Sequence, residues 1–216
     1  MLRVRELHVN SRVRLTNHIR GSLREYGLTI PLGVEAFEEQ VADRLSKLDF
    51  EPLKNHLTTA LYESRRAKKN EQMVEKELKE LLSGDIRLNY LMSIPGVGIM
   101  TAAAVIAVGD NLSRFNDSKS FASYVGLTPR EFSSGDKRRL GSVTKAGQEI
   151  LRRYLIHGAR TVMRYCNENS KEPLRKWAFK LKKKRGANKA TVALAHKLAR
   201  LCFIVVKEER DYKKNI

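Results

Sequence analysis

Mostly small or apolar residues recur between positions 53 and 81 at alternating spacings of four and three, which places them on one face of a helix. These residues are called the seam below. Its members are Leu53, Leu57, Ala60, Ser64, Ala67, Glu71, Val74, Leu78 and Leu81. Pro52 is a favourable first-turn residue, so a long helix is predicted to begin near it. The spacing favours a coiled coil through which chains self-associate as a homodimer or higher oligomer. The alternative is an ordinary amphipathic helix packed on its own neighbours, because Ser64 and Glu71 loosen the seam.

Two shorter amphipathic helices are predicted before this seam. The apolar face of the first comprises Leu15, Ile19, Leu23 and Tyr26, and Gly27 is expected to end it. The face of the second comprises Val34, Phe37, Val41, Leu45 and Leu48. Residues 83–85 (Ser-Gly-Asp) are expected to end the long helix. Residues 1–85 are therefore predicted to form a helical, coiled-coil dimerisation region.

Positive charge is concentrated in the rest of the chain. Residues 1–85 carry 15 Lys and Arg against 14 Asp and Glu, whereas residues 86–216 carry 27 against 10. Such a concentration in one folded region is typical of a polyanion binder, and nucleic acid is the commonest partner. A ribosomal or anionic membrane surface is the competing explanation. The asymmetry predicts two modules, with residues 86–216 as the nucleic-acid-binding domain.

Composition excludes several classes of protein. A hydrophobic content of 42% argues against disorder, and no apolar run approaches the length of a membrane span. The N-terminus lacks a signal-peptide core, so a cytoplasmic location is expected. Cys166 and Cys202 fall at apolar positions of predicted helices, which favours buried thiols over a disulfide or a metal site.

Residues 88–107 have the pattern of a helix-hairpin-helix. A short helix, a Pro-Gly-Val-Gly turn and a helix of small residues follow one another. Gly96 and Gly98 would expose backbone N–H groups at the start of the second helix, where the helix dipole favours a phosphate. Such a hairpin is predicted to grip the DNA backbone. The alternative is a tight structural turn between two core helices.

Residues 132–147 follow a proline-marked turn and combine hydroxyls, glycines and cations. Glycines let the backbone approach a ligand, cations neutralise phosphate, and a serine hydroxyl is a potential nucleophile. The cations of this segment are Lys137, Arg138, Arg139 and Lys145. The segment, expected to be an extended or hairpin loop, suits a phosphodiester. Composition alone would favour an exposed turn.

Helices are predicted to follow this loop, so the chain is expected to be mainly α-helical. Arg152 belongs to a set of arginines expected to decorate the first of them. Pro173 begins another, which ends in the basic residues Lys182, Lys183, Lys184 and Arg185, all candidates for phosphate contact. Trp177 lies among cations and could stack on a base, although a lone tryptophan is more often a core residue. The last helix is predicted to bury Leu194, Leu198, Leu201 and Val205.

The order of these motifs resembles that of the insertion-sequence 110 type transposases, a family related to the pilin-gene invertases and described as bridge-RNA-guided. The resemblance covers essentially the whole chain and is most specific over residues 88–165. It is carried by residues 94–98 (Ile-Pro-Gly-Val-Gly), 101–102 (Thr-Ala), 109–110 (Gly-Asp), 121–130 (Phe-Ala-Ser-Tyr-Val-Gly-Leu-Thr-Pro-Arg), 133–135 (Ser-Ser-Gly), 140–141 (Leu-Gly), 145–147 (Lys-Ala-Gly), 151–152 (Leu-Arg), 156–160 (Ile-His-Gly-Ala-Arg) and 193–200 (Ala-Leu-Ala-His-Lys-Leu-Ala-Arg).

The resemblance implies that a serine immediately before a glycine attacks the DNA phosphodiester and forms a phosphoserine. That residue is Ser134 here, with Ser133 as the fallback. The family also implies guide RNA, and magnesium held by four acidic residues of an RNase-H-like N-terminal domain. This sequence is expected to begin at the linker that follows such a domain, and thus to hold no metal and to be inactive alone. Asp110 and Asp136 are then interpreted as a cap and a turn residue.

Two other functions remain open from the sequence. One is a catalytically inert nucleic-acid binder that dimerises with or regulates a full-length transposase. The other is a helix-hairpin-helix DNA-repair accessory protein unrelated to transposition. Formation of a covalent protein–DNA adduct would separate the transposase from both.

Overall fold

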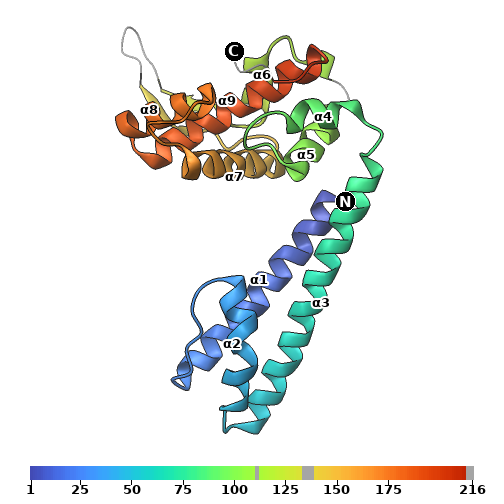
Figure 1. The fold of residues 1–216 in the computed structure, drawn as a ribbon, viewed down its shortest axis with the longest axis vertical. Helices are drawn as coiled ribbons and strands as arrows, with labels where there is room; N and C mark the ends of the chain where they lie inside the picture. The colour runs from blue at the N-terminus through green and yellow to red at the C-terminus, as the bar shows by residue number, and fades with distance from the viewer. Residues whose placement is uncertain (110–111, 133–138, 213–216) are drawn as a thin grey trace. The chain divides into compact units, whose positions relative to one another are not determined.

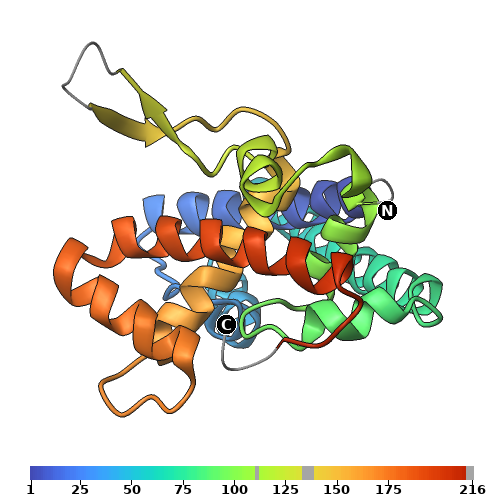
Figure 2. The ribbon, with the colours of Figure 1, turned by 90° about the horizontal axis from the view of Figure 1, so that it is seen from above.

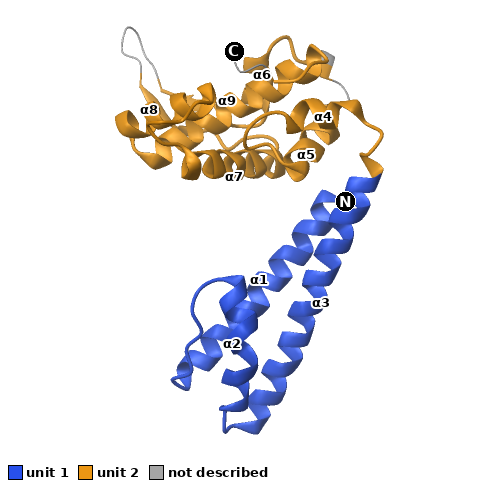
Figure 3. Ribbon diagram, viewed as in Figure 1, with its two compact units in different colours: residues 1–80 blue, residues 81–216 orange. Residues whose placement is uncertain are grey.

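The structure, a computed structural model, describes residues 1–109, 112–132 and 139–212 of the 216-residue chain. Its described part is mainly α-helical with one small sheet, which confirms the predicted fold class (Figure 1). The chain divides into two compact units, Met1–Glu80 and Leu81–Ile216 (Figure 3). The division falls after Glu80, a few residues before the boundary that the sequence predicts after residue 85.

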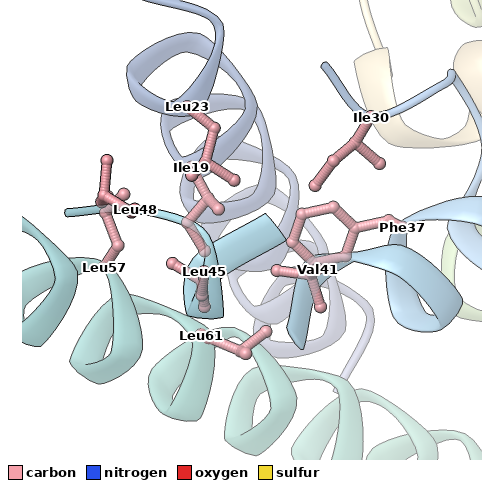
Figure 4. Packing of buried hydrophobic residues seen from close by; sticks show 9 residues of the cluster. All are labelled: Ile19, Leu23, Ile30, Phe37, Val41, Leu45, Leu48, Leu57 and Leu61. Atoms are coloured by element: carbon pink, nitrogen blue, oxygen red, sulfur yellow. The ribbon is translucent and has the colours of Figure 1, made fainter. Parts of the chain in front are cut away.

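Unit 1 consists of α1 (Leu2–Glu25), α2 (Val34–Ser46) and α3 (Glu51–Leu81). The predicted apolar faces of these helices meet in one cluster, drawn in Figure 4, which consists of Ile19, Leu23, Ile30, Phe37, Val41, Leu45, Leu48, Leu57 and Leu61. Burial of this many large apolar side chains is the main stabilising contribution in a unit of this size.

The seam of α3 is largely covered by the chain's own helices. Leu57 is buried against α1 and α2 in the cluster, and Ser64 is only 3% exposed. Glu71 interrupts the seam because it accepts two charged hydrogen bonds from α1, one from Arg5 Nη2 at 3.1 Å and one from Arg12 Nε at 3.0 Å. The arrangement matches the alternative of a helix packed on its own neighbours. The apolar seam is therefore explained without a partner chain, and self-association stays a prediction.

Replacement of Glu71 by alanine is expected to destabilise unit 1 by about 1–3 kcal/mol, because two partly buried guanidinium groups lose an ionised acceptor. Chemical denaturation followed by circular dichroism would measure this loss. Glu77→Ala, which removes an exposed carboxylate from the same helix, is the matched control and should change the free energy of unfolding by less than about 0.5 kcal/mol. Equal effects of the two substitutions would contradict the structural role of Glu71.

Unit 2 contains α4 (Ile86–Met92), α5 (Ile99–Gly109), the short 3-10 helix η1 (Leu112–Arg114), α6 (Ser118–Tyr124), α7 (Glu149–Tyr165), α8 (Pro173–Arg185) and α9 (Ala187–Lys207). α9 is the central element, because it packs against α4, α6, α7 and α8. Its predicted inward residues are all buried: Leu194, Leu198, Leu201 and Val205. Cys166 and Cys202 are buried free thiols, as predicted.

Two short antiparallel strands interrupt the helices of unit 2. β1 (Pro129–Glu131) pairs with β2 (Leu140–Val143), with Pro129 opposite Val143 and Glu131 opposite Leu140. In Figure 2 this hairpin extends away from the helices near the end where α8 meets α9. Along the described residues, no helix combines the length and apolar character that a membrane crossing requires.

Candidate nucleic-acid interface

The two chain segments that lead into and out of the β1–β2 hairpin lie in direct backbone contact, and this contact is called the crossing point below. Gly126 ends the turn after α6 with φ of 78°, and Gly147 precedes α7 with φ of 91°. A Cβ atom on Gly126 would overlap the carbonyl oxygen of Ala146, and one on Gly147 would overlap that of Tyr124. Both positions therefore require glycine for space as well as for backbone conformation. The two glycines therefore allow the segments on either side of the hairpin to pack closely against each other.

Arg152 joins these two segments through hydrogen bonds. It is buried, at 9% exposure, and its Nη1 donates to the carbonyl oxygens of Val125 at 2.9 Å and Ala146 at 3.3 Å. One carbonyl precedes the hairpin and the other follows it. The prediction that Arg152 decorates the surface and contacts phosphate is corrected here. The side chain faces inward because the first turn of α7 packs next to the crossing point.

Arg152→Met is expected to lower the stability of unit 2 by about 2–3 kcal/mol, because two buried carbonyl groups lose a charged donor while the volume of the side chain is largely kept. Thermal and urea unfolding would measure the change. Arg153→Met, one residue along the same helix and only partly buried, is the control and should cost less. An Arg152→Met protein with normal stability but weakened DNA binding would instead support the surface role.

The turn between α4 and α5 packs against α7. A Cβ on Gly96 would lie 2.6 Å from Val162 Cγ2 and 2.7 Å from the carbonyl oxygen of Gly158. Close packing therefore requires glycine at position 96. This agrees with the alternative interpretation of the segment as a tight structural turn between two core helices. Gly98, by contrast, is exposed immediately before the first residue of α5, with open space where a Cβ would lie. Phosphate contact by this turn stays a prediction.

The remaining predicted residues fall into two groups. Ser133, Ser134, Lys137 and Arg138 lie outside the described residues, as do Asp110 and Asp136. The cations Arg139, Lys145, Lys182, Lys183, Lys184 and Arg185 are exposed. Phe132 N donates to the carbonyl oxygen of Arg139 at 2.9 Å, so the described ends of the hairpin are paired up to these two residues.

A cavity of about 1070 Å³ lies between β2 and the helices α8 and α9. Its lining residues are Leu127, Pro129, Leu140, Gly141, Ser142, Val143, Trp177, Leu181, Arg185, Asn188, Lys189, Val192, Ala193, His196, Lys197, Arg200, Leu201 and Ile204. The lining thus contains apolar side chains and four cations, and no carboxylate is among the lining residues. Of the predicted phosphate contacts, Arg185 lies on this lining, which joins the basic end of α8 to the hairpin.

The charged groups of the cavity are held in specific contacts. Lys197 Nζ lies 4.6 Å from the centroid of the Trp177 ring, a cation–π geometry. Arg200 Nε donates to Ser118 Oγ at 3.2 Å. Burial, followed by the nearby Arg200 charge, lowers the pKa of His196 below its usual 6.5. The imidazole is therefore neutral at pH 7, and the positive field comes from Arg and Lys.

The part of the chain that the structure describes contains no group of three or more His, Cys, Asp or Glu side chains placed to hold a metal ion. A magnesium site needs several oxygen ligands around one position. The described residues therefore supply no cluster of three or more such ligands for magnesium.

Comparison with known proteins relates these elements to transposases. The model of the transposase IS116/IS110/IS902 family matches residues 88–175. The match begins in α4 and ends in α8, so it includes the glycines of the crossing point, Arg152 and both strands of the hairpin.

Relatives align over nearly the whole chain. The transposase for insertion sequence element IS1111A of Coxiella burnetii is 35% identical over 99% of this chain and 59% of its own length. A probable family 20 transposase of Pseudomonas aeruginosa is 32% identical over 99% of this chain and 64% of its own length. A pilin gene-inverting protein of Moraxella lacunata is 28% identical over 66% of this chain and 45% of its own length. The chain thus spans about three fifths of the length of the two transposases.

One wall of the cavity lies beyond the residues that the transposase family model matches. Trp177, Lys189 and Lys197 follow residue 175, whereas β2 lies within the match. Sequence reasoning missed the basic residues of α9 and assigned this helix to core packing. The signal that could have found them is the spacing of Lys189, Lys197 and Arg200, which are eight and three residues apart and therefore share one side of the helix.

Proposed function

We propose that this chain is the DNA-binding part of a transposase and that Ser134 is its nucleophile for strand cleavage and rejoining. The observation that carries the proposal is the crossing point beneath the hairpin. Gly126, Gly147 and Arg152 hold the two ends of the segment that contains Ser134 by close packing and buried hydrogen bonds. Anchored ends support the proposal, because a small misplacement of reacting groups slows a reaction strongly.

The chemistry expected of Ser134 is a transesterification. Its Oγ attacks phosphorus, the Oγ–P bond forms, and the bond from phosphorus to the departing sugar oxygen breaks. The serine gives up its hydroxyl proton and the sugar oxygen gains one, so the step is balanced without an oxidant or a cofactor. Rejoining reverses these bonds with a second DNA hydroxyl. The product of the first step is a covalent phosphoserine.

The cations near this segment would stabilise the charge that develops on phosphorus. Lys137 and Arg138 lie within the segment in sequence, and Arg139 and Lys145 are exposed on either side of β2. Positive groups placed at the developing charge are a large source of catalysis in phosphoryl transfer. Lys182, Lys183 and Lys184 would neutralise flanking phosphates.

We further propose that magnesium, held by acidic residues other than the described ones, and a guide RNA take part in the reaction. Bound magnesium would offset the charge on the attacked phosphate and on the departing oxygen. A homodimer or higher oligomer also remains a proposal, although the α3 seam is occupied within the chain. The reaction is therefore tested with these components supplied.

Covalent capture tests the proposal. The chain is incubated with a DNA substrate in which cleavage releases a short strand that diffuses away, together with an acidic domain from a longer relative, guide RNA and magnesium. A labelled protein–DNA adduct that survives denaturation is the expected result. DNA binding without an adduct under these conditions would overturn the nucleophile assignment and favour a catalytically inert binder.

A further inference from the structure

We propose that the cavity between β2 and the α8–α9 pair is a groove that binds unpaired DNA, with a base stacked on Trp177. The inference deepens the proposed function and rests on it for the choice of DNA as the strand. It concerns a surface that lies mostly outside the residues matched by the transposase family model. Four observations on the described residues support it.

The first observation is that the cavity combines an apolar surface with cations at one end, which are called the rim below. Trp177, Leu181 and Val192 are half-buried, so each keeps part of its apolar surface facing the cavity. Arg185 and Lys189 are exposed at the end where α8 gives way to α9. Sites for single-stranded nucleic acid combine these two features, because bases stack on apolar rings while cations follow the phosphates.

The second observation is the sign of the charge. Arg185, Lys189, Lys197 and Arg200 supply every charged side chain of the lining, and all are positive. An acidic peptide would also match this charge, but it offers no planar groups for the tryptophan face. A purely apolar partner would leave four cations poorly solvated, which costs free energy. Charge complementarity therefore favours a polyanion with planar bases.

The third observation is the Trp177–Lys197 pair. The ammonium group lies over the indole ring at 4.6 Å, and both side chains line the cavity. A base that enters can take the ring face while the ammonium pairs with the adjoining phosphate. Base faces are hidden within the stack of a duplex, so this contact requires an unpaired nucleotide.

The fourth observation is the position of the groove relative to the hairpin. Leu140–Val143, the strand that directly follows the Ser134 segment in sequence, forms one wall of the cavity. Nucleotides in the groove would therefore contact the hairpin strand that follows the proposed nucleophile in sequence, and the groove would keep those nucleotides unpaired.

Fluorescence of the full chain tests the groove directly, since Trp177 is the single tryptophan of the sequence. Titration with a short oligodeoxythymidine should quench this fluorescence with saturation, because the base stacks on the indole. A blunt DNA duplex should bind without comparable quenching. Equal quenching by the duplex, or no quenching by the single strand, would overturn the proposal. Tighter binding and stronger quenching by the matching oligouridine would assign the groove to RNA instead of DNA.

Matched charge removals test the rim. The Arg185→Ala/Lys189→Ala protein should lose roughly two phosphate contacts, which would reduce the slope of log affinity against log salt by about 1.4 for a single strand. The control is Arg175→Ala/Lys176→Ala, which also removes one exposed arginine and one exposed lysine from unit 2 but leaves the cavity lining intact. Equal losses in the two proteins would overturn the groove in favour of diffuse attraction.

Trp177→Ala is expected to weaken binding of a labelled oligodeoxythymidine roughly tenfold, as judged by fluorescence anisotropy. Trp177→Phe, which keeps an aromatic face, should recover most of the affinity, and circular dichroism would confirm that both variants are folded. Equal affinity of the two variants would contradict stacking. The binding measurements and the covalent capture test the two proposals separately. Quenching without an adduct would support the groove and contradict the role of Ser134 as nucleophile. An adduct without quenching would support Ser134 and contradict the groove.

Discussion

Ser134→Ala protein is expected to form no covalent adduct with the DNA substrate that captures the wild-type chain. The loss should be complete, because an alanine methyl group has no lone pair to attack phosphorus and water does not form a protein-linked product. Binding of the same DNA should stay within about twofold of wild type, since one neutral hydroxyl contributes little to an interaction dominated by phosphate charges. The measurement is a denaturing gel of labelled DNA, with binding followed in parallel.

Ser133→Ala is the matched control, because it removes the neighbouring hydroxyl from the same segment. It should retain the adduct. The reverse pattern, with the adduct lost in Ser133→Ala and kept in Ser134→Ala, would move the nucleophile by one residue. Adduct formation in both single variants would show that neither assignment is right.

Gly158→Ala is expected to destabilise unit 2 by about 2–4 kcal/mol, a large fraction of the stability of an ordinary domain. A Cβ at this position of α7 would overlap the carbonyl oxygen of Gly96 in the α4–α5 turn. Alanine favours the helix over glycine by about 1 kcal/mol, which offsets only part of the cost of overpacking two backbones. Urea unfolding monitored by circular dichroism would give the difference.

Gly98→Ala separates this packing role from phosphate contact. A Cβ on Gly98 meets no atom within 4 Å, so the stability of the protein should change by less than about 0.5 kcal/mol. If the backbone before α5 grips DNA, this substitution should weaken DNA binding while leaving the fold intact. A destabilisation equal to that of Gly158→Ala would contradict the distinction between the two ends of the turn.

Local signals predicted many helix boundaries correctly. Asp117, a residue type common at N-caps, caps α6, because its carboxylate accepts a hydrogen bond from Ser120 N at 2.7 Å. Pro173 begins α8, and α3 begins at Glu51, next to Pro52. Such features depend on a few neighbouring residues, so the sequence contains the information needed to find them.

Side-chain roles in the candidate site were harder to predict. The sequence pattern predicts a surface cation at Arg152, but the crossing segments place two carbonyl groups within hydrogen-bond distance of its guanidinium group. Trp177 was interpreted as a core residue with stacking as the alternative, and it is half-buried on the wall of the cavity. In both cases the environment is supplied by segments distant in sequence, which a helical pattern does not specify.

The sequence by itself determined that the chain is mainly helical, where several helices begin and end, that positive charge belongs to its second part, and which family its motifs resemble. These properties follow from local spacing, capping and composition. Only the tertiary structure decided that the α3 seam packs within the chain, that Gly96 and Gly158 meet, and that α8, α9 and β2 line one cavity. Such contacts depend on which faces of separate elements come together, and the physical reason is that close packing selects among faces whose sequence patterns are equally apolar.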